Sequence, residues 1–204
     1  GIKFDLKTIK LLNKINDSGV DICLISKYWD DEKLMEFYNL GYRKFGENRV
    51  DALVKRAQQF PNDIEWHFVG NIRSKDLGKI CEYATLIQSF DRPDLIEKLS
   101  KYKDIEVLIQ INLVDDKNRN GIELNDLEMV IEKLKSFEIT CNGFMTHPPI
   151  EISNERKLEV FNKMNEIFSN HPNFSILSMG TSNDYHLANK CGATLNRLGR
   201  ILFE

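Results

Sequence analysis

The 204-residue sequence has only four cysteines, and none of them belongs to a C-x-x-C pair. Cys23, Cys81, Cys141 and Cys191 are far apart, and no histidines cluster with them. A zinc site needs such a cluster of Cys and His ligands. We therefore expect no structural metal and interpret the cysteines as reduced thiols of a cytoplasmic protein.

Long apolar runs and an excess of charge are also lacking. No apolar stretch approaches the roughly 18 residues of a membrane-spanning helix. The first residues, "GIKFDLKTIK", contain no apolar signal region, so secretion is not expected. The formal net charge of −3 gives no electrostatic reason to expect nucleic acid or an anionic membrane as a partner.

Two glycine-rich phosphate motifs are missing as well. The G-x-G-x-x-G turn of a dinucleotide-binding, doubly wound sheet does not occur. "GNIRSKDLGK" ends in glycine and lysine, but seven residues separate Gly70 from Gly78, and Ile80 follows Lys79. The G-x-x-x-x-G-K-[ST] pattern of a P-loop is therefore absent.

What the sequence does have is a regular alternation of short apolar runs and amphipathic stretches. The runs are rich in Ile, Leu and Val, as expected for parallel strands buried on both faces. Eight strands are predicted, at Val20–Ser26, Lys44–Glu47, Glu65–Val69, Thr85–Ser89, Val107–Asn112, Ile139–Met145, Phe174–Ser178 and Thr194–Leu198.

The stretches between these strands carry helical periodicity. In "ENRVDALVKRAQQF", Val50, Leu53, Val54 and Ala57 fall on one helical face. Further helices are predicted at Asp5–Ile15, Asp31–Leu40, Lys75–Tyr83, Pro93–Tyr102, Asn125–Phe137, Asn154–Phe168 and Asn183–Lys190. Strict alternation predicts an α/β protein whose residues 1–204 form a single (β/α)₈ TIM barrel domain, with an open doubly wound sheet as the alternative.

In such a barrel the active site lies at the C-terminal ends of the strands. The loops after strands seven and eight often hold a phosphate there. The seventh strand is followed by "SMGTSND", which offers hydroxyl groups and a predicted helix start at Ser182-Asn183. The eighth ends in "RLGR", where Gly199 lets the backbone approach an anion. The two loops together predict a phosphate site.

Lys27 follows the first strand directly, in "LISKYWDD". A lysine in a phosphate-binding pocket is expected to be desolvated and close to other cations, which lowers its pKa and lets its amine attack a carbonyl group. Two chemistries fit: a sugar-phosphate aldolase, or a lysine that holds pyridoxal phosphate. The residues by themselves do not choose between them, and they leave open a third interpretation, in which Lys27 is an ordinary solvated lysine.

Four longer motifs carry a family resemblance. "FGENRV", "WHFVGNIRS", "LSMGTSNDY" and "NRLGR" resemble the pyridoxal phosphate homeostasis protein (YggS/PROSC) family, in the right order from about Asp21 to Phe203. The resemblance implies a fold-type III pyridoxal phosphate barrel, like the N-terminal domain of alanine racemase but without its C-terminal β domain. It also implies pyridoxal 5′-phosphate as the cofactor.

The same resemblance implies roles for individual residues. Lys27 would hold the cofactor as an aldimine, and Asn48 would lie beside it. Arg197 would face the pyridine nitrogen. The cofactor phosphate would be bound by the residues that match the two phosphate loops of the family, namely Ser178, Thr181, Ser182, Gly199 and Arg200. Arg200 stands where threonine is common in the family.

These roles favour a carrier over an efficient enzyme. An arginine cannot accept a proton, so the pyridine ring opposite Arg197 is a weaker electron sink than it would be opposite an aspartate. The chain also ends at Glu204, without the second domain that supplies a racemase with its second base. We therefore expect a monomer that serves vitamin B6 homeostasis, delivers cofactor to apo-enzymes and has no robust catalytic activity. The alternative is an amino-acid racemase or another slow aldimine-based enzyme.

Overall fold

The computed structural model describes residues 6–116 and 119–203; Asp5, where the first helix is predicted to begin, lies outside them. Strands occur where the short apolar runs predict them, because Ile, Leu and Val pack well on a sheet that is buried on both faces. The strands are β1 (Asp21–Ile25), β2 (Lys44–Glu47), β3 (Glu65–Phe68), β4 (Leu86–Phe90), β5 (Glu106–Asn112), β6 (Ile122–Glu123), β7 (Thr140–Met145), β8 (Ile176–Thr181) and β9 (Leu195–Leu198).

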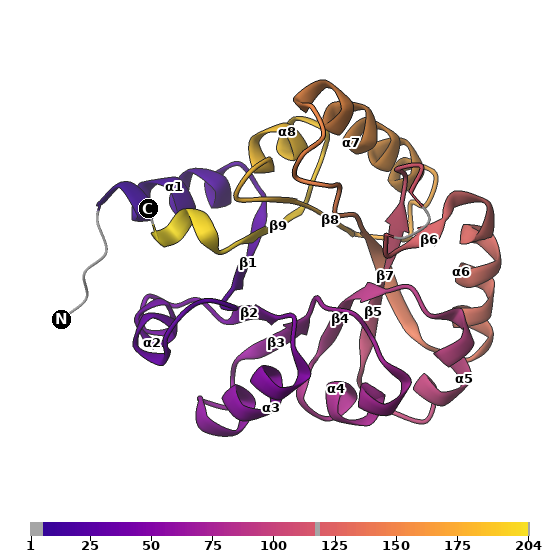
Figure 1. Cartoon of the computed structure of the whole chain (residues 1–204), viewed down its shortest axis with the longest axis horizontal. Coiled ribbons are helices and arrows are strands. Elements are labelled where there is room, and N and C mark those ends of the chain that lie inside the picture. The colour runs from indigo at the N-terminus through magenta and orange to yellow at the C-terminus, as the bar shows by residue number, and fades with distance from the viewer. Residues whose placement is uncertain (1–5, 117–118, 204) are drawn as a thin grey trace.

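Eight of these strands form a closed parallel barrel (Figure 1). The hydrogen-bonded order runs β4-β3-β2-β1-β9-β8-β7-β5, and pairing of β4 with β5 closes the ring. The register between β1 and β9 places Cys23 opposite Arg197. The two-residue strand β6 pairs with β5 alone. The predicted (β/α)₈ barrel is confirmed, and the open doubly wound sheet is excluded by the closure.

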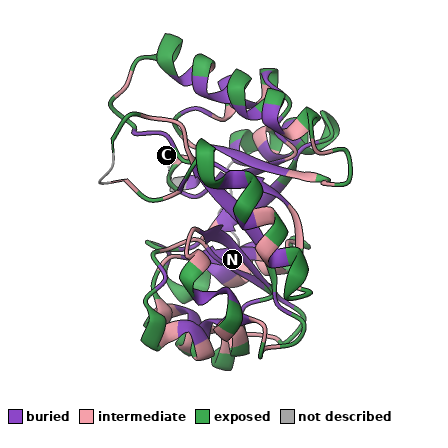
Figure 2. Cartoon of the chain, turned by 90° about the vertical axis from the view of Figure 1, so that its right-hand side faces the viewer, coloured by how far each residue is buried: buried purple, intermediate pink, exposed green. Residues whose placement is uncertain are grey.

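Helices surround the ring on its outer side (Figure 1). Figure 2 shows exposed and buried residues alternating along the helices that face the viewer, whereas the strands are mostly buried. In α7 the buried side includes Val160, Phe161, Met164 and Ile167, at the spacing of one helical face. The helices are α1 (Leu6–Asp17), α2 (Asp31–Asn39), α3 (Val50–Gln59), α4 (Leu77–Tyr83), α5 (Ile96–Leu99), α6 (Leu127–Ser136), α7 (Asn154–Ser169) and α8 (Tyr185–Lys190).

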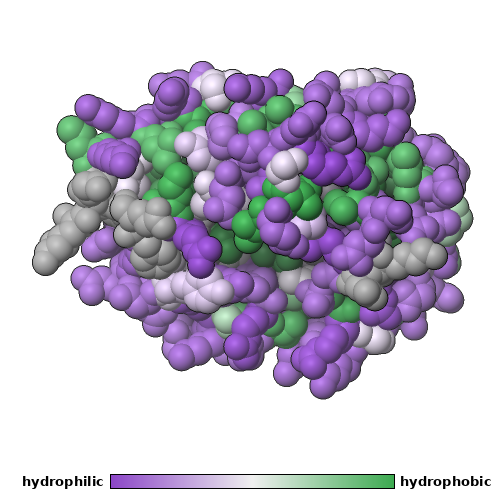
Figure 3. Space-filling model, turned by 45° about the horizontal axis from the view of Figure 1, so that its top comes forward, coloured by the Kyte–Doolittle hydropathy of each residue, from purple (hydrophilic) through white to green (hydrophobic). Residues whose placement is uncertain are grey.

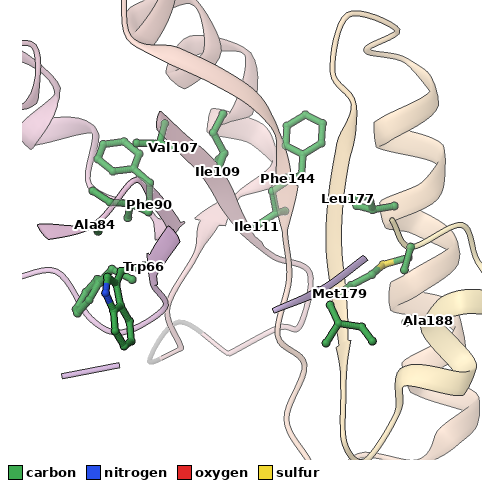
Figure 4. Close-up of a cluster of buried hydrophobic side chains, with 14 of the residues drawn as sticks. Trp66, Ala84, Phe90, Val107, Ile109, Ile111, Phe144, Leu177, Met179 and Ala188 are labelled. Atoms are coloured by element: carbon green, nitrogen blue, oxygen red, sulfur yellow. The ribbon is translucent and has the colours of Figure 1, made fainter. Parts of the chain in front are cut away.

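The hydrophobic core lies between the barrel strands and this layer of helices (Figure 4). Phe144 on β7, Leu177 on β8 and Ala188 on α8 are fully buried in it. Phe144 also packs edge-to-face against Phe174, with 5.1 Å between the ring centroids. The surface shown in Figure 3 is mainly hydrophilic, with hydrophobic residues among the polar ones. None of the described helices combines the length and the apolar character that crossing a bilayer requires.

Strand β8 differs most from its prediction. It runs on to Thr181, whereas the sequence predicts that it ends at Ser178, and α8 begins at Tyr185 instead of Asn183. A register shift against β9 lies between Ser178 and Thr181, where Gly180 has a positive φ of 99°. Because this irregular segment is polar, its sequence has the composition of a loop although it continues the sheet.

Candidate functional site

A cavity of about 1420 Å³ lies at the C-terminal ends of the barrel strands. Its wall includes residues that follow β1, β2, β3, β8 and β9, such as Lys27, Asn48, Gly70, Ser182 and Gly199. The location agrees with the predicted position of the site. The sequence positions are far apart, and closure of the barrel brings them together.

The cavity wall is strongly basic, although the whole sequence is slightly acidic. Seven lysine and arginine residues line it in the described part of the chain, against two aspartates. The basic residues are Lys27, Arg49, Lys55, Arg73, Lys79, Arg197 and Arg200, and the acidic ones are Asp51 and Asp76. A concave wall of one sign raises the local concentration of ligands of the opposite sign. The wall is therefore suited to an anion.

Lys27 presents its amine to this cavity from the end of β1. Its Nζ lies 4.7 Å from the centre of the ring of Tyr28, which is 70% exposed. The predicted desolvation of Lys27 is wrong, because the side chain is exposed. Arg197 and Arg200 line the same cavity as Lys27, and their closeness to its amine stays a prediction.

Arg56 on α3 holds the segment that carries Lys27. One guanidinium nitrogen, Nη1, donates to the backbone carbonyl of Ser26 at 2.6 Å and to Oε2 of Glu47 at 3.1 Å. The other, Nη2, donates to the carbonyl of Trp29. The Ser26 hydroxyl also donates to Glu47, whose carboxyl is buried. Burial raises the pKa of Glu47, and the bonds from Ser26 and Arg56 oppose that rise.

Arg197 on β9 is buried at the base of the cavity. It donates from Nη1 to the Ser178 hydroxyl at 2.7 Å and from Nη2 to the Thr146 carbonyl at 2.9 Å. Burial lowers the pKa of Arg197 to about 10, so the guanidinium is still protonated at neutral pH. No carboxylate forms an ion pair with Arg197 among the residues that the structure describes. Arg197 lines the cavity, so a ligand there can contact its guanidinium.

Ser178 is fully buried and does not line the cavity in the described structure. The sequence predicts Ser178 at a phosphate, whereas the structure places it behind Arg197. Its hydroxyl accepts the bond from Arg197 and donates to Oε1 of Gln88 at 2.6 Å. Ser178 therefore acts on the cavity through Arg197.

Two backbone N–H groups near the end of β9 point at one oxygen atom. Gly199 N and Ile201 N donate to the Ser182 hydroxyl oxygen at 3.4 Å and 3.0 Å. Converging N–H groups of this kind form a concavity that also suits an anion oxygen. The sequence predicts that glycine is needed at position 199 for the backbone to approach an anion. The structure shows a different need: a Cβ at Gly199 would lie 2.5 Å from the carbonyl oxygen of Ile25, so glycine permits packing against β1.

Thr181 uses its donors elsewhere. Its backbone N–H and its hydroxyl both donate to Oδ1 of Asp184, at 2.7 Å and 3.1 Å. Asp184 is buried, and its other oxygen lies 3.6 Å from Nζ of Lys157. The predicted helix start at Ser182-Asn183 is wrong, because α8 begins at Tyr185, directly after Asp184. Thr181 lines the cavity but offers a ligand less than the sequence predicts.

Asn48 and Arg200 complete the set of predicted site residues. Asn48 is half-buried and Arg200 is exposed, and both line the cavity. The loops after β2 and β3 touch here, since a Cβ on Gly70 would lie 2.1 Å from the Asn48 carbonyl oxygen. The structure thus brings all the predicted residues except Ser178 to the cavity wall.

Known proteins resemble this chain in sequence and in structure. The family model described as "Alanine racemase, N-terminal domain" matches residues 21–204. A pyridoxal phosphate homeostasis protein from Aquifex aeolicus is 32% identical over 190 residues, which cover 87% of this chain and 83% of that protein. The chain belongs to the pyridoxal phosphate homeostasis protein family.

A further relative and two solved structures extend the likeness. The Haemophilus influenzae protein of the same name is 29% identical and is covered to 86%. The structure of PipY of Synechococcus elongatus with PLP bound matches with a TM-score of 0.86 at 26% identity, covering 97% of this chain and 99% of that one. An arginine decarboxylase from a Paramecium bursaria Chlorella virus is only 16% identical, with a TM-score of 0.76, and shares the fold.

Proposed function

We propose that this chain binds pyridoxal 5′-phosphate in the basic cavity, holds it covalently on Lys27 and serves vitamin B6 homeostasis. The observation that carries the proposal is the arrangement of three kinds of group around one cavity: the Lys27 amine, the buried Arg197 guanidinium, and the Ser182 hydroxyl, on which the N–H groups of Gly199 and Ile201 converge. Family membership and the solved PipY complex with PLP support it.

Each group suits a different part of the cofactor. The Lys27 amine is a nucleophile that can add to the aldehyde and form a Schiff base with loss of water. Phosphate oxygens can replace the Ser182 hydroxyl as the acceptor of the Gly199 and Ile201 N–H groups, and the Arg200 side chain lines the same cavity. Arg197 can donate to the pyridine nitrogen, and Asn48 can lie against the ring.

Arg197 also bears on what the bound cofactor can do. Pyridoxal phosphate supplies an electron sink when its ring nitrogen is protonated. Arg197 donates and cannot accept a proton, so it favours an unprotonated nitrogen and a weak sink. This arrangement suits a protein that stores the reactive aldehyde and releases it, with apo-enzymes as recipients. We propose that it does so as a cytoplasmic monomer.

The alternative is a slow amino-acid racemase, which the match to the alanine racemase N-terminal domain favours. Racemisation needs a proton acceptor on each face of the substrate carbon. Incubation with D- and L-alanine separates the two functions. A carrier exchanges cofactor with negligible interconversion of the enantiomers, and sustained turnover would establish the enzyme.

The test of cofactor binding is a visible absorption spectrum with pyridoxal phosphate, before and after borohydride reduction. We expect a Schiff-base band that borohydride abolishes, and mass spectrometry should place the reduced adduct on Lys27. Lys27→Ala should lose the band. Lys55→Ala removes another lysine of the same cavity and should keep it. A wild-type protein without the band at saturating cofactor would refute the proposal.

A further inference from the structure

A chain of hydrogen bonds crosses the barrel interior and ends at Arg197. Nδ1 of His67 on β3 lies 2.8 Å from Nε2 of Gln88 on β4. Gln88 accepts from Ser178 on β8 at 2.6 Å, and Ser178 accepts from Arg197 on β9 at 2.7 Å. All four side chains are at least 95% buried. Four strands thus contribute to one buried polar network.

The direction of every bond in this network follows from its cationic end. A guanidinium only donates, so the Ser178 oxygen accepts from Arg197 and its single proton goes to Gln88. The Gln88 carbonyl is then occupied, and its NH₂ group faces His67. His67 must accept at Nδ1, which places its proton on Nε2. If the imidazole were protonated, its Nδ1–H would face the NH₂ group of Gln88, and two donors would lie opposite each other.

Arg197 depends on this network for its position. Among the residues that the structure describes, its guanidinium bonds only to two neutral oxygens, those of Ser178 and Thr146, and forms no ion pair. A neutral acceptor holds a cation well only when its own proton points away. His67 and Gln88 ensure that orientation of the Ser178 hydroxyl.

We propose that His67 and Gln88 are positioning residues, which act through Ser178 to aim Arg197 at the pyridine nitrogen of the bound cofactor. The inference rests on the proposed function, because it assigns Arg197 a contact with pyridoxal phosphate. It adds two residues on β3 and β4 that do not line the cavity in the described structure.

The experiment compares binding of pyridoxal phosphate with that of its 1-deaza analogue, in which carbon replaces the pyridine nitrogen. Both compounds keep the aldehyde and the phosphate. The change in ring electronics is the same for the wild type and for every variant, so a difference in preference between the proteins reports the contact with Arg197. A hydrogen bond to a charged group corresponds to about tenfold or more in affinity, and the wild type should prefer pyridoxal phosphate by that factor.

Two variants of His67 form a matched pair. His67→Leu removes the acceptor, and the preference should fall to within about twofold of unity because Arg197 loses its fixed direction. In His67→Asn the amide oxygen takes nearly the place of Nδ1, and the preference should be retained. Full preference in a folded His67→Leu protein would overturn the inference.

The outcomes for the wild type separate this inference from the proposed function. Failure to bind either compound would refute the function itself. Binding of both with equal affinity would leave the function intact and overturn the inference. Because His67→Leu can fail to fold, ¹⁵N NMR of the wild-type imidazole supplies a second test. A proton on Nε2 is the expected result, and a proton on Nδ1 would overturn the proposed bond directions.

Discussion

At the scale of single residues, His67 links folding stability to pH. Burial, and next the nearby charge of Lys44, lower the pKa of His67 to about 4, from an ordinary value of 6.5. Between these two values the unfolded chain binds a proton that the folded chain excludes. His67 therefore contributes its full stabilisation above about pH 6.5, and this stabilisation is lost as the pH falls toward about 4. His67 alone should make the free energy of unfolding about 2 kcal/mol lower at about pH 5 than at about pH 7, and His147, whose pKa is also lowered to about 4, mainly by desolvation, adds a loss of its own.

Urea unfolding of the wild type and of His67→Asn at both pH values checks this prediction. The amide of asparagine does not titrate. Acidification should therefore lower the free energy of unfolding of the variant by about 2 kcal/mol less than that of the wild type. The difference between the two proteins isolates His67 from the other titrating groups. Equal losses would show that His67 is not buried as a neutral ring.

At the scale of elements, Arg56 joins α3 to the ends of β1 and β2. Its bonds to Ser26, Trp29 and Glu47 hold the turn that presents Lys27. Arg56→Met keeps much of the apolar stem but leaves the Glu47 carboxylate buried without its cation. Breaking a buried pair in this way costs roughly 3–5 kcal/mol, so we expect a loss of about 3 kcal/mol in the free energy of unfolding.

The double variant Glu47→Gln/Arg56→Met is the matched control, because it removes the buried charge together with its partner. It should recover a large part of the stability lost in Arg56→Met. Urea unfolding measures both. Formation of the Schiff-base band should be slower in both variants, since the Lys27 turn is released in each. An unchanged rate would contradict the role of Arg56 in presenting Lys27.

The elements also show what the sequence can predict. The eight barrel strands are predictable because each is a short apolar run between amphipathic helices, and Lys27 and Gly199 are predictable because they directly follow such runs. The contacts of Arg56 and Gln88 could not be predicted from the sequence, because they join residues that are far apart in the chain. Ser178 and Gln88, for example, are 90 positions apart. Strand β8 is too irregular and polar for its full length to be recognised, and β6 is only two residues long.

At the scale of the whole molecule, charge is distributed unevenly. The sequence carries a net charge of −3, yet the cavity wall in the described residues holds seven cationic side chains and two acidic ones. Most of the acidic residues therefore lie elsewhere on the protein. A cofactor that brings a phosphate is attracted by this local field, while the rest of the surface disfavours anions.

This separation predicts a salt dependence that distinguishes the phosphate from the aldehyde. Raising the salt concentration from about 0.1 M to about 1 M shortens the Debye length from about 10 Å to about 3 Å, which screens the exposed lysines and arginines of the wall. The Kd for pyridoxal phosphate should rise by about tenfold, corresponding to about 1.4 kcal/mol. Pyridoxal, which lacks the phosphate but keeps the aldehyde, should bind more weakly and change its Kd by less than about twofold. Equal responses of the two ligands in fluorescence titrations would show that the basic wall does not act on the phosphate, and the N–H groups of Gly199 and Ile201 would then have to bind it alone.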